Sequence, residues 1–123
     1  MAKILMVDDD AEFLEASKTL LEANGYAVTV SSNAGNAIAV INSVKPDIIF
    51  LDIMMETPDD GIVLANKIRK EGIKTPIVML SGVGKVTGYE YGKCDEVLPC
   101  NDFLEKPVSP KDLLNKVKNI LKK

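Results

Sequence analysis

Short apolar runs alternate along the chain with segments in which apolar residues recur at helical spacing. The short runs are typical of strands that are buried on both faces of a sheet. They cover residues 3–7, 26–30, 47–51, 77–80 and 102–105. The amphipathic segments cover residues 12–24, 34–44, 62–70 and 110–122. This alternation predicts an α/β fold, in which a doubly wound five-stranded parallel sheet carries helices on both faces.

Residues that end or begin helices support these limits. Gly25 stands where a helix C-terminal cap is expected, and Pro46 ends the second helical segment. Ser109-Pro110 combines a capping side chain with proline at the first helical position. In the third helical segment, the basic residues Lys67, Arg69 and Lys70 are expected on the outer face. Residues 84–99 contain three glycines and a proline, and therefore do not predict a regular helix.

Length and composition narrow the class of protein. With 123 residues, 46% of them hydrophobic, we expect one domain spanning residues 1–123. The net charge of −3 provides no basic footprint for direct nucleic-acid binding. No apolar run reaches the roughly 18–20 residues of a membrane span, and acidic residues at 8–10 argue against an export signal. We therefore expect a cytoplasmic protein without membrane contact, in which Cys94 and Cys100 are reduced thiols.

Histidine is absent from the chain. Its absence excludes histidine metal ligands, a Ser-His-Asp triad and phosphohistidine formation on this chain. Any acid–base or metal chemistry must therefore come from carboxylates, hydroxyls, thiols or lysines.

Polar residues follow four of the predicted strands. Asp8 and Asp9 follow the first run, Asp52 the third, Ser81 the fourth and Lys106 the fifth. Ligands of open parallel sheets bind outside the carboxyl ends of the strands, where the strand order reverses. A strand order of 2-1-3-4-5 would make the first and third strands neighbours. The three aspartates would then converge, and the hydroxyl group of Ser81 and the ammonium group of Lys106 would approach them from the side.

Three crowded carboxylates repel each other unless they share protons or hold a divalent cation. A site with only oxygen ligands suits Mg²⁺ (or Mn²⁺) better than Zn²⁺. An oxygen nucleophile, a metal ion, a lysine and a hydroxyl group are together what phosphoryl transfer requires.

Four motifs carry a resemblance to a known family. VDDD (7–10), IIFLD (48–52), MLSG (79–82) and FLEKP (103–107) resemble the receiver domain of response regulators in two-component signalling. The resemblance extends from Lys3 to the last helix and implies the flavodoxin-like fold. It also implies that Asp52 accepts a phosphoryl group from a histidine kinase or phosphotransfer protein in a magnesium-dependent reaction.

The resemblance implies further roles for matching residues. Asp9 would bind the metal ion directly and Asp8 largely through water, while Asp52 and the backbone carbonyl of Met54 would complete the protein ligands. In the same way, Ser81 and Lys106 would contact the phosphoryl group, and Lys106-Pro107 resembles the usual cis peptide of the family.

The implied output is a two-state switch rather than an enzyme activity on other molecules. Ser81 would move toward the phosphoryl group and Phe103 would fill the vacated space, which changes partner binding. The protein would be a monomer or a phosphorylation-dependent dimer. Met54 and Val83 are apolar at positions that tune water access, so we expect slow self-dephosphorylation. The 24 residues between Ser81 and Lys106 slightly exceed the usual family spacing. The sequence therefore does not predict whether this chain forms the surface through which the family usually binds its output partner.

Other functions remain open at this stage. The pair Asp8-x-Asp10 loosely fits a phosphohydrolase, although the chain is short for that class. A flavin-binding domain would share the architecture, but acidic strand ends repel a phosphate. A phosphorylation-independent interaction domain and a receiver belonging to a longer protein are both compatible with the sequence. The sequence does not identify the kinase or the output partner.

Overall fold

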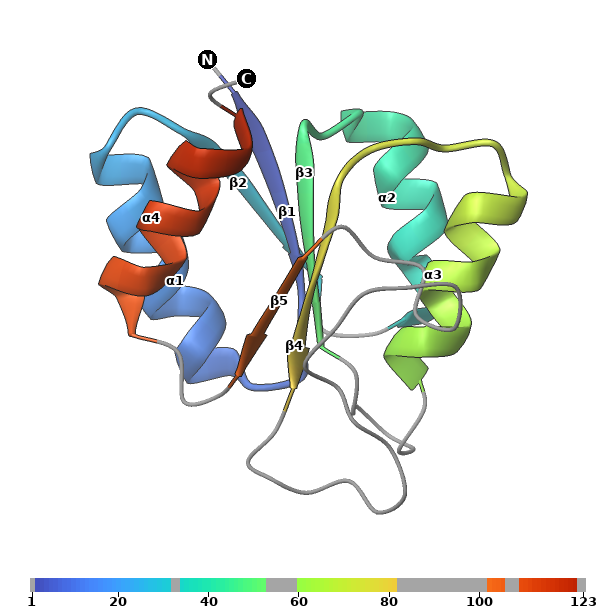
Figure 1. Ribbon diagram of the computed structural model, residues 1–123, viewed down its shortest axis with the longest axis horizontal. Coiled ribbons are helices and arrows are strands. Elements are labelled where there is room, and N and C mark those ends of the chain that lie inside the picture. The colour runs from blue at the N-terminus through green and yellow to red at the C-terminus, as the bar shows by residue number, and fades with distance from the viewer. Residues whose placement is uncertain (1, 32–33, 53–59, 82–101, 106–108, 122–123) are drawn as a thin grey trace.

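The computed structural model describes residues 2–31, 34–52, 60–81, 102–105 and 109–121 (Figure 1). The elements follow one another as β1 (Lys3–Val7), α1 (Ala11–Ala23), β2 (Ala27–Ser31), the 3₁₀ helix η1 (Ala34–Asn36), α2 (Ala37–Val44), β3 (Ile48–Asp52), α3 (Asp60–Lys70), β4 (Ile77–Ser81), β5 (Asp102–Glu105) and α4 (Pro110–Leu121). Each predicted strand and helical segment is present, with ends that differ by at most two residues except at the start of α2. The predictions for residues 84–99 and for the thiols of Cys94 and Cys100 lie outside the described residues.

The strands form one parallel five-stranded sheet in the order β2-β1-β3-β4-β5. This is the predicted doubly wound order, with β1 and β3 as neighbours at the point where the chain reverses direction across the sheet. Helices α1 and α4 cover one face, and α2 and α3 cover the other (Figure 1). The carboxyl ends of all the strands therefore open at one edge of the sheet.

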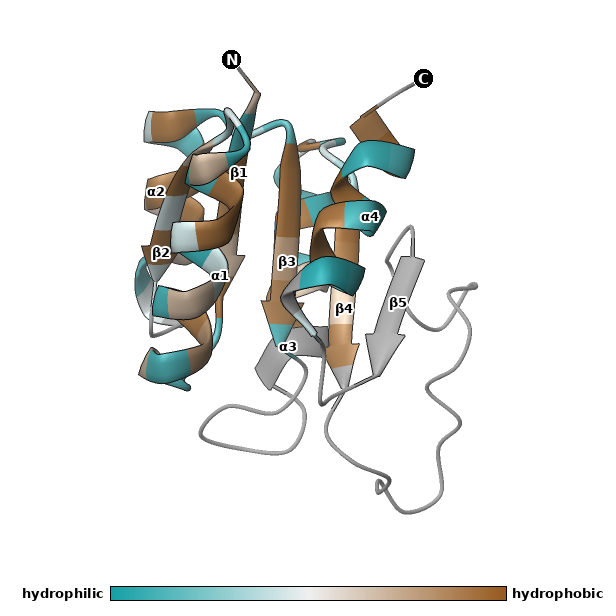
Figure 2. Cartoon of the chain, turned by 90° about the vertical axis from the view of Figure 1, so that its left-hand side faces the viewer, coloured by the Kyte–Doolittle hydropathy of each residue, from teal (hydrophilic) through white to brown (hydrophobic). Residues whose placement is uncertain are grey.

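Alternating side chains divide the core into two layers. In β1, Ile4 and Met6 pack beneath α1 and α4, whereas Leu5 and Val7 pack beneath α2 and α3. The central strands β3 and β4 alternate in the same way. Because both faces are buried, these strands are hydrophobic at nearly every position, and Figure 2 shows β3 and β4 predominantly brown. The polar residues that do occur on these strands lie at their ends.

Helix ends follow the local sequence, with one exception. The Ser109 hydroxyl accepts a hydrogen bond from the backbone N–H of Asp112 at 3.1 Å, as the Ser-Pro start of α4 predicts. Helix α2 ends before Pro46 through Lys45, which adopts the left-handed conformation (φ 55°, ψ 63°). The exception is the second helical segment, whose first turn (Ala34–Asn36) is a 3₁₀ helix rather than an α-helix.

Arg69 differs from the prediction of an outward-facing side chain. It is half-buried, and its Nη1 atom donates hydrogen bonds to the carbonyl oxygens of Ile73 and Thr75, both at 2.9 Å. Burial lowers the pKa of the guanidinium group, but a guanidinium group stays protonated in proteins. Arg69 therefore ties the end of α3 to the segment leading into β4. Lys67 and Lys70 are exposed, as predicted.

In the described part of the chain, no helix combines the length and the apolar character needed to cross a membrane.

Candidate functional site

Three aspartates meet at the carboxyl edge of β1 and β3. Asp8 and Asp9 directly follow β1, and Asp52 is the last residue of β3. The pairing of Val7 with Leu51 brings these ends to the same level. One carboxylate oxygen from each aspartate lies within 4.8 Å of the other two. The convergence that the predicted strand order required is therefore present.

The three carboxylates differ in burial. Asp8 is 0% exposed and Asp52 is 3% exposed, whereas Asp9 faces solvent. Negative groups held together away from water are costly unless a cation or hydrogen bonds compensate them. The cluster offers only carboxylate oxygens as ligands, and its member Asp9 is exposed to solvent. This donor set fits a hard divalent cation such as Mg²⁺ or Mn²⁺.

Backbone contacts hold Asp8 in place. Its N–H donates to the carbonyl oxygen of Ser31 at 3.1 Å, and its Oδ1 atom accepts from the N–H of Asp10 at 3.0 Å. Asp10 is in turn the N-cap of α1. The sequence motifs did not indicate the contribution of Ser31, because a backbone carbonyl leaves no side-chain signature.

Ser81 and Phe103 can be placed through their strands. Ser81 is the last residue of β4, one position beyond Leu80, which pairs with Asp52. Phe103 lies in β5 and pairs with Met79. Ser81 is thus at the same sheet edge as the aspartates, on the adjacent strand, and Phe103 lies one strand further. The predicted site residues Met54 and Lys106, together with Val83, lie outside the described residues.

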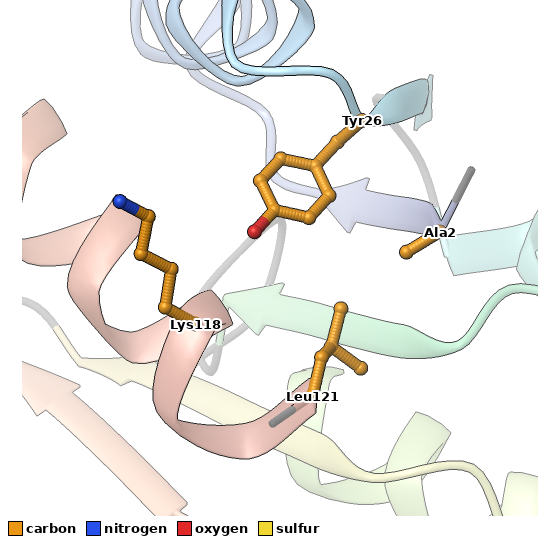
Figure 3. A pocket seen from close by; sticks show the side chains of 4 residues that line it. All are labelled: Ala2, Tyr26, Lys118 and Leu121. Carbon is orange, nitrogen blue, oxygen red and sulfur yellow. The ribbon is translucent and has the colours of Figure 1, made fainter. Parts of the chain in front are cut away.

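A separate hollow of about 460 Å³ opens at the opposite edge of the sheet (Figure 3). Its described lining residues are Ala2, Tyr26, Lys118 and Leu121. The side chains of Tyr26 and Leu121 reach toward it from β2's amino end and from the end of α4 (Figure 3). None of these four residues carries a carboxylate, so this hollow lacks the metal-binding character of the aspartate cluster.

Comparison with known proteins agrees with this geometry. Residues 4–118 match the response regulator receiver domain family. The chain is 35% identical, over 98% of its length, to the phosphate regulon transcriptional regulatory protein PhoB of Pseudomonas aeruginosa and covers 52% of that protein. It is also 35% identical, over 98% of its length, to the probable transcriptional regulator ycf27 of Pyropia yezoensis and covers 48% of it. The chain spans about half the length of the curated relatives it matches.

Two solved structures are similar over their whole length. The receiver domain of a Francisella response regulator is 33% identical and superposes with a TM-score of 0.83. The match covers 99% of this chain and 98% of that one. A two-component response regulator from Clostridium difficile is 32% identical, with a TM-score of 0.80, covering 100% of this chain and 98% of the other. The strand order and the position of the aspartates thus occur within a fold shared with these proteins.

Proposed function

The chain belongs to the response regulator receiver domain family, and we propose that Asp52 is the residue that accepts its phosphoryl group. The supporting observation is the meeting of Asp8, Asp9 and Asp52 at one sheet edge, with carboxylate oxygens within 4.8 Å of one another. Asp52 is the member of this cluster on the central strand β3, and it is almost fully buried. This location beside other carboxylates that could bind a cation supports the proposed role of Asp52 as the nucleophile.

The proposed reaction is transfer from a phosphohistidine of a sensor histidine kinase or a phosphotransfer protein. An Oδ atom of Asp52 forms a bond to phosphorus as the phosphorus–nitrogen bond of the donor breaks. The donor imidazole leaves with the electron pair of that bond and takes up a proton, and Asp52 becomes an acyl phosphate. The 123 residues contain no histidine, so the phosphohistidine donor must lie outside them.

Asp8, Asp9 and Asp52, with the backbone carbonyl of Met54, are the groups that would hold Mg²⁺ or Mn²⁺. When bound, the cation neutralises negative charge on the transferring phosphoryl oxygens. The chain's own part is to keep these carboxylates close together and to hold Asp8 through Ser31 and Asp10.

We assign the remaining roles by family and by position on the sheet. Ser81 would donate its hydroxyl to the phosphoryl group and Lys106 would pair with it. Movement of Ser81 toward that group, with Phe103 filling the space, would form the switch. The position of Ser81 on β4 beside Asp52 supports its part in this set.

The wider assignment rests on the family as well. Residues 1–123 would act as a single receiver domain in the cytoplasm, as a monomer or a phosphorylation-dependent dimer. It would bind its kinase and an output partner without contacting nucleic acid or membrane itself. The relatives PhoB and ycf27 are named as transcriptional regulators. We propose that any contact with DNA would be made by residues other than these 123.

The test is mass spectrometry after incubation with a small phosphodonor such as acetyl phosphate, with and without Mg²⁺. We expect one magnesium-dependent phosphoryl group, mapped to Asp52 and missing in Asp52→Asn. Asp47→Asn is a matched control, because Asp47 is an exposed aspartate at the opposite edge of the sheet. It should be labelled like the wild type.

Two other results would contradict the assignment. Label on Asp8 or Asp10 would indicate the Asp-x-Asp hydrolase chemistry. No label in the presence of demonstrated Mg²⁺ binding would favour an interaction domain that works without phosphorylation.

We also propose that the phosphoryl group is lost slowly, because Met54 and Val83 are apolar. The half-life of the purified phosphoprotein is followed by loss of the mass increment in the absence of a phosphatase. A half-life on the order of seconds would contradict this proposal.

A further inference from the structure

We infer that Asp10 is a positioning residue for the cation site, because its capping of α1 fixes the turn that presents Asp8 and Asp9. This inference rests on the proposed function. It assigns a role to the third aspartate of the Asp8-Asp9-Asp10 run, whose side chain is not part of the carboxylate cluster.

The first step is the cap itself. The Asp10 Oδ1 atom accepts hydrogen bonds from the backbone N–H groups of Glu12 at 3.1 Å and Phe13 at 3.2 Å. Its backbone carbonyl accepts from the N–H of Leu14 at 3.0 Å. The two side-chain bonds satisfy N–H groups that have no backbone partner within the helix, and the carbonyl accepts the first intrahelical bond. Asp10 is therefore fixed to the first turn of α1 through both its side chain and its backbone.

The second step is the bond from Asp10 to the cluster. The N–H of Asp10 donates to Asp8 Oδ1 at 3.0 Å, and the N–H of Asp8 donates to the carbonyl of Ser31 at 3.1 Å. Asp8 is thus attached to β2 on one side and to the cap of α1 on the other. Asp9 lies between two residues that are both held. The exposed carboxylate of the cluster therefore gains its position from its neighbours in the chain.

The third step concerns what is lost when the cap is lost. Without the cap, the first turn of α1 and the N–H of Asp10 gain freedom, and cation binding must then order the turn. Groups that orient metal ligands in this indirect way typically contribute about 10-fold or more to metal affinity. By reciprocity, a cation that needs the ordered turn also stabilises the capped state of α1.

Two substitutions separate the cap from the charge. Asn caps a helix about as well as Asp, whereas Ala does not cap. Asp10→Asn and Asp10→Ala remove the same negative charge, so any difference between them reports the cap. We expect Asp10→Ala to weaken Mg²⁺ binding by roughly 10-fold and Asp10→Asn to stay within about threefold of the wild type, because an exposed charge is screened. Isothermal titration calorimetry with MgCl₂ measures both.

A second readout reports the order of the α1 cap directly, and like the calorimetry it needs no phosphorylation. Hydrogen exchange of the Glu12 and Phe13 amides should slow when Mg²⁺ is added to the wild type, and should respond less in Asp10→Ala. Ser109→Ala is the matched control, because it removes the equivalent cap of α4. It should lower stability without changing Mg²⁺ affinity.

The inference is overturned on its own if the wild type binds Mg²⁺ and both Asp10 variants bind it equally well. It is also overturned if Mg²⁺ leaves exchange of the Glu12 and Phe13 amides unchanged. Absence of Mg²⁺ binding by the wild type would overturn the proposed cation site and this inference together, so the two failures can be distinguished.

Discussion

Lys3 and Asp47 hold each other across the starts of β1 and β3. The N–H of Lys3 donates to Asp47 Oδ2 at 2.8 Å, and the N–H of Asp47 donates to the carbonyl of Lys3 at 2.7 Å. The Nζ atom of Lys3 also donates to the carbonyl of Val44 at 3.3 Å, near the end of α2. These contacts align the amino ends of the two strands whose carboxyl ends present the aspartate cluster.

Loss of the Asp47 side chain should therefore reduce stability. We expect Asp47→Ala to lower the free energy of unfolding by about 1 kcal/mol, the usual net contribution of such a hydrogen bond. Asp47→Asn retains an acceptor oxygen and should lose less. Urea denaturation followed by circular dichroism measures both. Equal losses would show that the charge of Asp47, rather than its hydrogen bond, provides the stabilisation.

Ser17, on the inner face of α1, has a hydroxyl group whose removal should increase stability rather than reduce it. It is 1% exposed, and its Oγ atom has no hydrogen-bond partner among the described residues. An unsatisfied buried hydroxyl is costly, and alanine is also the better helix former. We expect Ser17→Ala to raise the free energy of unfolding by about 0.5–1 kcal/mol. A thermal melt that shows a lower midpoint for Ser17→Ala would indicate that the hydroxyl has a partner such as a bound water.

Lys45 is the non-glycine residue with a positive φ in the described part of the chain. The left-handed conformation costs a side chain of this kind roughly 1–2 kcal/mol, and glycine recovers this cost at some expense in unfolded-state entropy. Lys45→Gly should therefore stabilise the protein by about 0.5 kcal/mol. Lys67→Gly, in the interior of α3, should instead destabilise it by about 1 kcal/mol. If chemical denaturation shows that both variants lose stability, strain at Lys45 is not significant.

The aspartate cluster should couple stability to divalent cations. Removing one negative charge with Asp52→Asn should raise stability in the presence of EDTA, because it relieves repulsion within the cluster. Added Mg²⁺ at ten times its dissociation constant should stabilise the wild type by about 1.4 kcal/mol and the variant by much less. Thermal melts of both proteins across a MgCl₂ series measure this difference. A variant that responds to Mg²⁺ as the wild type does would exclude Asp52 from the cation site.

Sequence predicted the fold well where the pattern is local. The apolar run of β3, its end at Asp52 and the Ser-Pro start of α4 all follow from short-range rules, and all are present. The pair of hydrogen bonds between Lys3 and Asp47 was not predictable, because the two residues are 44 positions apart in the chain. Arg69 was misplaced for a similar reason. Its carbonyl partners lie in the following turn, and their positions depend on how that turn folds.

The candidate site was predictable to a different degree. The positions of Asp8, Asp9 and Asp52 at strand ends, combined with the expected strand order, were enough to predict their convergence. The roles of Ser81, Phe103, Lys106 and Met54 came from the family resemblance and stay predictions. The tie from Asp8 to Ser31 could not be anticipated, because any residue at that position offers the same carbonyl oxygen.

Ala2 and Leu121 both line the hollow at the amino edge of the sheet. Almost the entire chain separates these residues in sequence, yet the fold returns one to the other, far from the aspartates. A short peptide linker could therefore join the two ends into a ring, and new ends could be cut elsewhere. The uncut ring would lose less chain entropy on folding than an open chain, and a permutant cut away from β1 and β3 would retain the aspartate cluster.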